Sequence, residues 1–428
     1  MIPPALSVWN YALLLPIKFV HYPPVKYFRT FAFISCFTFL LFCISCNSGT
    51  KPKTVTTTDS VIILLPKPVP LSESEKQRLS YNCRLWYDSV LKNTSFNGGI
   101  LVAKNGNIIF EEYKGMKHPG LHDSINATTP MHIASVSKTF TAMAVLKLAE
   151  DGKLNITDLF SKYFPQFNYE GVTIKTLLNH RSGLPNYLYF MEDLGWDKSH
   201  YITNTDVLAY LVQRKSELKN IGTPDRKFSY CNTNYVLLAL LIEKISGLSF
   251  SDYLSKTFFE PLRMRNTFVF SLADTASITH SYDWRGNKIE INFLDQAYGD
   301  KNLYSTPRDL LIWDRALTRH LLLKKETIEP AYTPYSNERP GIKNYGLGWR
   351  MNVYPTGKKI IFHNGWWHGS NAVFIRLLDD DATIIVLGNR YTRAIYKASH
   401  LANIFSHYFD FTTENNTESV SPDSVSTP

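Results

Sequence analysis

The chain has 428 residues, which is enough for two or three average domains or for one large fold. Its composition is that of a globular protein, with 44% hydrophobic and 19% charged residues. The formal net charge of +9 is modest for this length, and no Lys/Arg-rich block with interleaved aromatic residues occurs. The sequence therefore argues against nucleic acid as a partner.

Residues 1–46 have the architecture of an export signal. The cations Lys26 and Arg29 precede an uninterrupted apolar run from Phe31 to Cys46. This run is shorter than the roughly 20 residues that a membrane-spanning helix needs. Its end resembles a bacterial lipoprotein cleavage box, in which Cys46 would be lipidated, and the alternative is an uncleaved membrane anchor. Both alternatives predict an exported, membrane-tethered protein, periplasmic or on the cell surface.

Two polar segments flank the region that we expect to be globular, residues 75–411. Residues 47–74 are rich in Thr, Ser, Lys and Pro and read as a tether, although the apolar run 61–65 inside them is a candidate for docking on the domain. Residues 412–428 read as a disordered tail. No feature specifies an oligomeric state, so a monomer is the default expectation.

The domain contains two of the five cysteines, Cys83 and Cys231. Two are too few for a disulfide framework, and the sequence leaves open whether they pair. Neither the cysteines nor the scattered histidines show metal-ligand spacing, so we predict no metal and no other cofactor.

The domain begins with a predicted helix from about Ser74, whose apolar residues recur at steps of three and four. Two strands follow, Gly99–Ala103 and Ile108–Tyr113, and the Asn-Gly pair between them is a strong hairpin signal. A long, mainly helical region then extends to about residue 320. Strand signals return after it, and a last helix closes the domain; the expected strands are Gly346–Tyr354, Lys359–Phe362, Asn371–Leu377 and Thr383–Leu387, and the helix carries Ile395, Ala398, Leu401, Phe405 and Tyr408.

This order of elements predicts an α+β fold. An antiparallel sheet would be split by a large helical insertion lobe, and helices from both ends of the chain would flank the sheet. The boundary between two such lobes is the expected place for a functional site.

The most informative segment runs from His132 into the apolar stretch ending at Ala149. On a helix, Ser135 and Lys138 share a face, which places a hydroxyl beside an amine. A serine hydroxyl becomes a useful nucleophile when a neighbour takes its proton, and burial lowers the pKa of a lysine enough for that role. Alone, Ser-x-x-Lys is a weak signal, since an N-capping serine followed by a solvated lysine gives the same pattern.

Two later motifs make this signal specific. Tyr230 and Asn232 stand in a Tyr-x-Asn motif before a predicted helix, and His363 to Gly365 form a His-x-Gly motif at a strand. In this order the three motifs resemble those of the serine β-lactamase and penicillin-binding-protein superfamily, with its β-lactamase/transpeptidase-like fold. The Tyr-x-Asn form is similar to the branch that holds class C β-lactamases, D-alanyl-D-alanine carboxypeptidases and related esterases.

The resemblance implies a role for each motif residue. Ser135 would be the nucleophile, and Lys138 or Tyr230 would take its proton, with Tyr230 later acting as acid toward the leaving group. Asn232 would bind Lys138 and the substrate amide. The backbone N–H groups of Ser135 and Trp366 would form the oxyanion hole, and the motif His363, Asn364 and Gly365 would line the substrate site.

His363 and Asn364 depart from the Lys-Thr-Gly that is usual in the lactamase branch. The sequence therefore predicts a serine hydrolase that acts through an acyl-enzyme on D-amino-acid peptides of peptidoglycan, or on small esters. The alternatives are a β-lactamase and a catalytically silent module that binds cell wall or penicillin.

Overall fold

The computed structural model describes residues 62–410, apart from residues 119 and 121. These residues fall within one compact unit, Thr58–Pro428. The predicted leader with its lipidation residue Cys46, and the predicted tail 412–428, lie outside the described residues.

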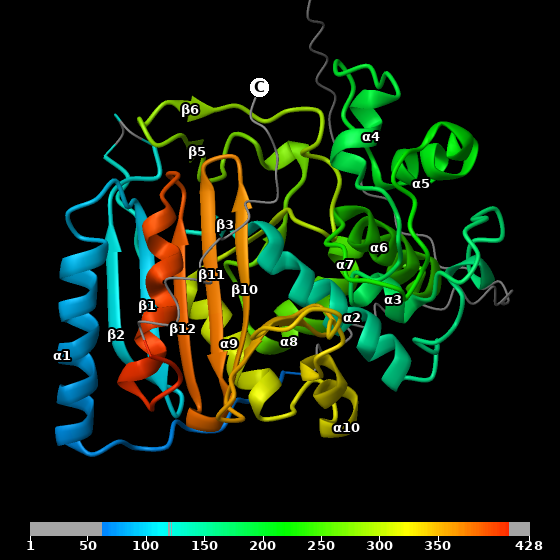
Figure 1. The fold of residues 1–428 in the computed structure, drawn as a ribbon. Helices are drawn as coiled ribbons and strands as arrows, with labels where there is room; N and C mark the ends of the chain where they lie inside the picture. The colour runs from blue at the N-terminus through cyan, green and yellow to red at the C-terminus, as the bar shows by residue number, and fades with distance from the viewer. Residues whose placement is uncertain (1–61, 119, 121, 411–428) are drawn as a thin grey trace, which may run out of the picture. The chain divides into compact units, whose positions relative to one another are not determined.

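The centre of the domain is a seven-stranded antiparallel sheet with the order β2-β1-β12-β11-β10-β9-β8 (Figure 1). The N-terminal hairpin therefore pairs with the last strand of the chain, and the helical region is inserted between them, as predicted. The strands are β1 (Gly98–Lys104), β2 (Asn107–Lys114), β8 (Lys343–Tyr345), β9 (Arg350–Val353), β10 (Lys359–Trp367), β11 (Ser370–Leu377) and β12 (Ala382–Gly388).

The central strands are buried on both faces, because side chains along a strand alternate between the faces. In β12, Ile384 and Val386 pack with α1 (Glu73–Val90) and the 3-10 helix η8 (Arg393–Ile404), whereas Ile385 and Leu387 pack into the helical lobe. Figure 1 shows α1 and η8 on one face of the sheet, as expected for helices from the two chain ends.

The other face carries the helical lobe. Its central helices are α2 (Ser137–Glu150) and α6 (Asn232–Ser246), which pack against each other and are buried on almost every side. The other helices are η1 (Ala134–Val136), η2 (Phe160–Lys162), α3 (Ile174–Leu178), α4 (Tyr187–Asp193), α5 (Asn204–Gln213), η3 (Lys215–Glu217), α7 (Phe250–Leu254), η4 (Ser255–Phe259), α8 (Glu260–Leu262), η5 (Leu272–Asp274), α9 (Pro307–Thr318), α10 (Lys325–Ile328), η6 (Glu329–Tyr332) and η7 (Leu378–Asp380).

Short strands complete the fold beside this lobe. One small sheet has the order β3-β7-β4, and a hairpin is formed by β5 and β6. Their bounds are β3 (Met131–His132), β4 (Phe268–Val269), β5 (Ser281–Tyr282), β6 (Lys288–Ile289) and β7 (Leu303–Ser305). Among the described residues no single helix has the length and hydropathy of a membrane span, although the bent pair Asn232–Ser246 and Phe250–Leu262 passes on length and composition alone.

Three predicted elements differ from the structure. The strand expected over Lys359–Phe362 continues to Trp367 as β10 and contains the His-x-Gly motif. The single strand expected over Gly346–Tyr354 is interrupted, because residues 346–349 form a turn between β8 and β9 in which Gly348 has φ +84° and lies against α2. The closing helix is a 3-10 helix that ends at Ile404, so Phe405 and Tyr408 follow it rather than belong to it.

The end of the segment predicted as a tether lies along the domain. Ile63 and Leu65 are partly buried against the core, and the Ile63 N–H donates to the Pro261 carbonyl at 2.8 Å. Further on, the Val69 N–H donates to the Asn105 carbonyl at 3.1 Å. This strap, residues 62–71, therefore contacts both the helical lobe and the β1–β2 turn.

Candidate active site

Ser135 lies in η1, the 3-10 turn that leads into α2. The turn is held in an unusual conformation, with Ala134 at φ +47°, and the His132 ring accepts the Ala134 N–H at 3.1 Å. A non-glycine residue at positive φ persists only where its surroundings fix it. Ser135 is thereby left partly exposed, while the rest of the turn and α2 are buried.

The Lys138 amine is the centre of the site. Lys138 is fully buried, and its Nζ donates to Ser135 Oγ at 3.0 Å, to Asn232 Oδ1 at 2.8 Å and to the backbone carbonyl of Asp300 at 2.7 Å. All three acceptors are neutral oxygens. The sequence-predicted pairing of the hydroxyl with the amine is present, and Asn232 holds the amine in place from the first turn of α6.

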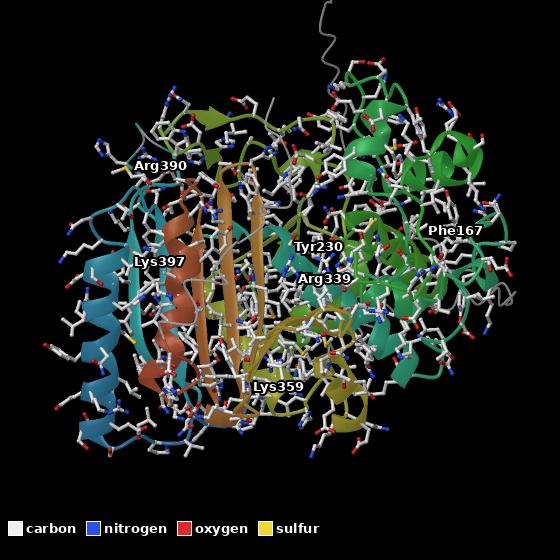
Figure 2. All side chains as sticks on the ribbon, viewed as in Figure 1. Phe167, Tyr230, Arg339, Lys359, Arg390 and Lys397 are labelled. Atoms are coloured by element: carbon white, nitrogen blue, oxygen red, sulfur yellow. The ribbon has the colours of Figure 1, made fainter. Side chains whose placement is uncertain are left out.

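Tyr230 lies beside this amine, between the sheet and the helical lobe (Figure 2). The Lys138 Nζ is 5.0 Å from the centroid of its ring. The chain on either side of Tyr230 is held by His180, whose carbonyl accepts the Ser229 N–H at 2.9 Å and whose Nδ1 accepts the Cys231 N–H at 3.1 Å. The His180 and Tyr230 rings are 4.3 Å apart. His180 is therefore a structural residue that positions Tyr230.

Sequence reasoning missed a second cation, Arg350 on β9. Its guanidinium carbon lies 4.6 Å from the centroid of the Tyr230 ring. The Lys138 amine and the Arg350 guanidinium thus both lie within 5.0 Å of the centroid of the Tyr230 ring, where a positive charge on either group favours the phenolate. Arg350 belongs to none of the three motifs, and its contact with Tyr230 depends on where the fold places β9.

His363 is fully buried, on β10. Its Nε2 lies 3.2 Å from the Tyr345 hydroxyl, and its Nδ1 lies 2.7 Å from the Asn364 carbonyl. Burial lowers the pKa of His363 well below 6.5, and the charges of Arg350 and Lys138 lower it further. The ring is therefore neutral at pH 7, so Arg350 rather than His363 supplies positive charge on this side of the site.

Gly365 brings β10 against the nucleophile turn. A Cβ at this position would lie 2.4 Å from the Ile133 carbonyl and 3.2 Å from the Ser135 nitrogen. The next residue, Trp366, follows this contact directly, and its ring packs 5.5 Å from that of Tyr391. Next to Gly365, the Asn364 Oδ1 is buried and accepts no hydrogen bond from the described residues.

The segment 299–303 was not predicted as part of the site, yet it supports α2. Thr141 donates to the Gly299 carbonyl at 2.7 Å, and the Leu303 N–H donates to Ser137 Oγ at 3.1 Å. Between them, the buried Lys301 lies 3.6 Å from the Asp300 carboxylate, with its ammonium 4.7 Å from the centroid of the Trp367 ring. Asp300 and Lys301 are neighbours in the sequence, but the local sequence does not show that both are buried, because the fold decides that.

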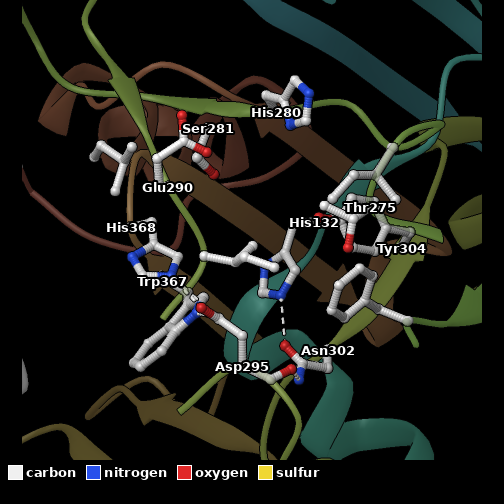
Figure 3. A pocket seen from close by; sticks show the side chains of 14 residues that line it. His132, Thr275, His280, Ser281, Glu290, Asp295, Asn302, Tyr304, Trp367 and His368 are labelled. Atoms are coloured by element: carbon white, nitrogen blue, oxygen red, sulfur yellow. Dashed lines mark hydrogen bonds and ion pairs between the residues drawn. The ribbon is translucent and has the colours of Figure 1, made fainter. Parts of the chain in front are cut away.

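A cavity lies beside Trp367, the last residue of β10, and His368, the residue that follows it (Figure 3). Its volume is about 30 Å³, and its walls include His132, Asp295 and Tyr304. Figure 3 shows the hydrogen bond of 3.1 Å between His132 and Asn302 at its edge. Across the described part of the chain, no group of three or more His, Cys, Asp or Glu side chains is arranged to hold a metal ion.

Comparison with known proteins identifies the family. The family model described as Beta-lactamase matches residues 90–408. Penicillin-binding protein 4* of Bacillus subtilis (strain 168) is 31% identical over 346 residues, which cover 76% of each chain.

Two solved structures have similar folds. A penicillin binding protein from Bacillus halodurans superposes with a TM-score of 0.65 at 25% identity and covers 74% of this chain and 98% of its own. A D-stereospecific amidohydrolase from Streptomyces sp. gives a TM-score of 0.57 at 21% identity, over 77% of this chain and 98% of its own. This chain belongs to the beta-lactamase family, within the superfamily of serine β-lactamases and penicillin-binding proteins.

Proposed function

We propose that the protein is a serine hydrolase that forms an acyl-enzyme on Ser135 and transfers the acyl group to water. The observation that carries this proposal is the hydrogen bond of 3.0 Å from the fully buried Lys138 amine to Ser135 Oγ. In the reaction, the Ser135 oxygen attacks a carbonyl carbon while Lys138 or Tyr230 takes the hydroxyl proton. The same proton then passes to the leaving group as its bond to the acyl carbon breaks.

For the substrate we propose peptides that end in a D-amino acid with a free carboxylate, as in peptidoglycan. Arg350 supports this choice, because a guanidinium beside Tyr230 offers a paired, charge-assisted contact to a carboxylate. The edge of β10 supports it as well. The strand pairs with β9 only up to Phe362, whereas it pairs with β11 up to Trp367, so residues 363–367 present an edge along which an extended peptide can lie.

Two other functions and one other substrate class are kept as alternatives. A β-lactamase would share the acylation step and would differ in fast hydrolysis of a lactam acyl-enzyme; the neutral His363 in place of a lysine weighs against it. Small esters would need no contact with Arg350. A catalytically silent module would bind peptidoglycan and would leave Ser135 unmodified.

We also propose that the protein is exported and held at the membrane by a lipid on Cys46 or by an uncleaved anchor. This part rests on the leader sequence alone. A substrate in the cell wall would then be within reach of the tethered domain.

The experiment is intact-protein mass spectrometry of residues 62–410 after exposure to a fluorescent penicillin, to a D-Ala-D-Ala peptide and to p-nitrophenyl esters. We expect a covalent adduct on Ser135 with the penicillin, turnover of the peptide, and no adduct in Ser135→Ala. Rapid lactam hydrolysis without an accumulating adduct would favour the β-lactamase. Absence of both adducts and turnover in the wild-type protein would refute the hydrolase.

A further inference from the structure

A buried acid lies beside the turn that follows the expected oxyanion-hole residue Trp366. Asp295 is 3% exposed, and its Oδ1 accepts a hydrogen bond from Trp367 Nε1 at 2.6 Å. Its Oδ2 lies 2.9 Å from His368 Nε2 and accepts the Asn292 N–H at 2.5 Å. Both residues that follow Trp366 in the chain are therefore bound to one carboxylate, and Figure 3 shows the three side chains together.

This carboxylate remains charged. Burial by itself raises the pKa of Asp295, but the hydrogen bonds and charge of His368, the Asn292 N–H and the Trp367 indole outweigh burial and hold the pKa below its usual value. Removing one partner from a buried, bonded charge is costly, so each of these bonds contributes to holding the cluster together. We call Asp295, Trp367 and His368 the Asp295 latch.

The latch holds the outer end of β10, where it adds to the packing of Trp366 on Tyr391 and of Lys301 on Trp367. Trp366 and Trp367 pair with Asn371 and Ser370 of β11, and His368 then reverses the chain at φ +50°. On the other side of these residues lies the unpaired edge of β10 described above. Trp367 and His368 both line the cavity described above, so their bonds to Asp295 lie at its wall.

The loop that carries Asp295 also holds the nucleophile turn. Asn302 donates to the Asp295 carbonyl at 2.6 Å, and its Oδ1 lies 3.1 Å from His132 Nε2. His132 in turn accepts the Ala134 N–H, one residue before Ser135. One loop, residues 292–303, therefore contacts the chain on both sides of the expected oxyanion hole.

We propose that Asp295 is a positioning residue, which fixes the Trp366 N–H relative to the Ser135 N–H through the Asp295 latch. This inference rests on the proposed function, because it requires an oxyanion hole formed by these two groups. A displacement of about 1 Å at such a hole lowers rates by about 100-fold, since its donors act only when they are correctly placed.

The test compares Asp295→Ala and Asp295→Asn in residues 62–410. With p-nitrophenyl acetate we expect kcat to fall about 10- to 100-fold in Asp295→Ala and less in Asp295→Asn, which keeps an acceptor for Trp367, while KM changes little. Affinity for phenylboronic acid, whose adduct on Ser135 places an oxygen in the hole, should fall in parallel. A purely structural role would lower thermal stability without this parallel loss.

Asp314→Asn is the matched control. Asp314 is also buried and forms an ion pair with Arg376 on β11. Arg376 lies five positions further along β11 than Asn371, the partner of Trp366, and this places it about 17 Å from Asn371 along the strand. This variant should lose stability and keep kcat. If Asp295→Ala does not fold, Trp367→Phe and His368→Asn each remove one bond of the latch and are expected to lower kcat and boronate affinity together.

The outcomes separate the two proposals. A folded Asp295→Ala with wild-type kcat and boronate affinity would refute the latch and leave the hydrolase intact. A wild-type protein that reacts with none of the acyl donors would refute the hydrolase, and the latch would be refuted with it.

Discussion

Arg350 is the residue whose role is least visible in the sequence and most open to test. We expect Arg350→Gln to raise KM for a D-Ala-D-Ala peptide about 10- to 100-fold, because a charge-assisted hydrogen bond contributes about 1.5–3 kcal/mol. KM for an uncharged p-nitrophenyl ester should not change. Since the guanidinium also lies on the Tyr230 ring, kcat falls for both substrates, and the ratio of the two KM values is the quantity to measure.

Arg319→Gln is the control for this prediction. Arg319 forms an ion pair with Asp381 on the surface at the end of α9, and its loss should change neither KM. Equal KM changes for peptide and ester in Arg350→Gln would contradict a carboxylate contact and would favour an esterase.

Single residues also show where sequence reasoning succeeds. Ser135, Lys138 and Asn232 belong to ordered motifs, and the structure places them in direct hydrogen bonds. His363 was recognised from its motif, but its charge state was not, because burial and the neighbouring Arg350 decide that and neither is visible in the local sequence.

Among the elements, the contact between β10 and η1 is the one on which the geometry of the site depends. We expect Gly365→Ala to lower kcat by about 100-fold or more, because its Cβ would push the strand away from the Ile133 carbonyl and separate the two oxyanion donors. Overpacking of this kind also costs about 1–3 kcal/mol of unfolding free energy. Steady-state kinetics and urea denaturation measure the two effects.

Gly357→Ala provides the comparison for an element without such a contact. Gly357 lies in the β9–β10 turn at φ +83°, and an added Cβ would meet nothing within 4 Å. This variant should lose a little stability through backbone strain and retain full activity. If Gly365→Ala kept the wild-type kcat, the displacement of β10 from the Ile133 carbonyl would not matter for catalysis, and the prediction would be contradicted.

The elements were predictable to the extent that their patterns are local. The β1–β2 hairpin and α1 follow from a turn signal and from helical spacing. The break between β8 and β9 was not predictable, because Gly348 serves a contact with Ala142 on α2 that is distant in sequence. The loop 292–303 was missed for the same reason, since the Asp295 carboxylate binds residues more than seventy positions away.

At the scale of the whole molecule, three buried histidines make stability depend on pH. Burial lowers the pKa of His132 to about 4 and the pKa values of His180 and His363 well below 6.5. Unfolding returns each ring to water, where its pKa is about 6.5. Below pH 6.5 the unfolded chain therefore binds more protons than the folded one, so stability is full above this pH and is lost as the pH falls.

We expect the free energy of unfolding to decrease between pH 6.5 and pH 5 by up to about 1.4 kcal/mol per pH unit for each of these histidines. Urea denaturation at pH 7, 6 and 5 measures this slope. His132→Asn should reduce the slope by the share of one histidine, up to about 1.4 kcal/mol per pH unit. His407 is exposed, so His407→Gln should leave the slope unchanged. A free energy that is constant from pH 7 to pH 5 would contradict the assignment of three neutral rings.

The positions of the two cysteines of the domain have a practical consequence. Cys83 lies in the core between the sheet and α1, and Cys231 lies in the core of the helical lobe; both are free and buried. The question that the sequence left open is thus answered, because the two thiols occupy opposite sides of the sheet. No disulfide therefore joins Cys83 and Cys231, so a reducing agent can be present in every assay described above without breaking a bond between them.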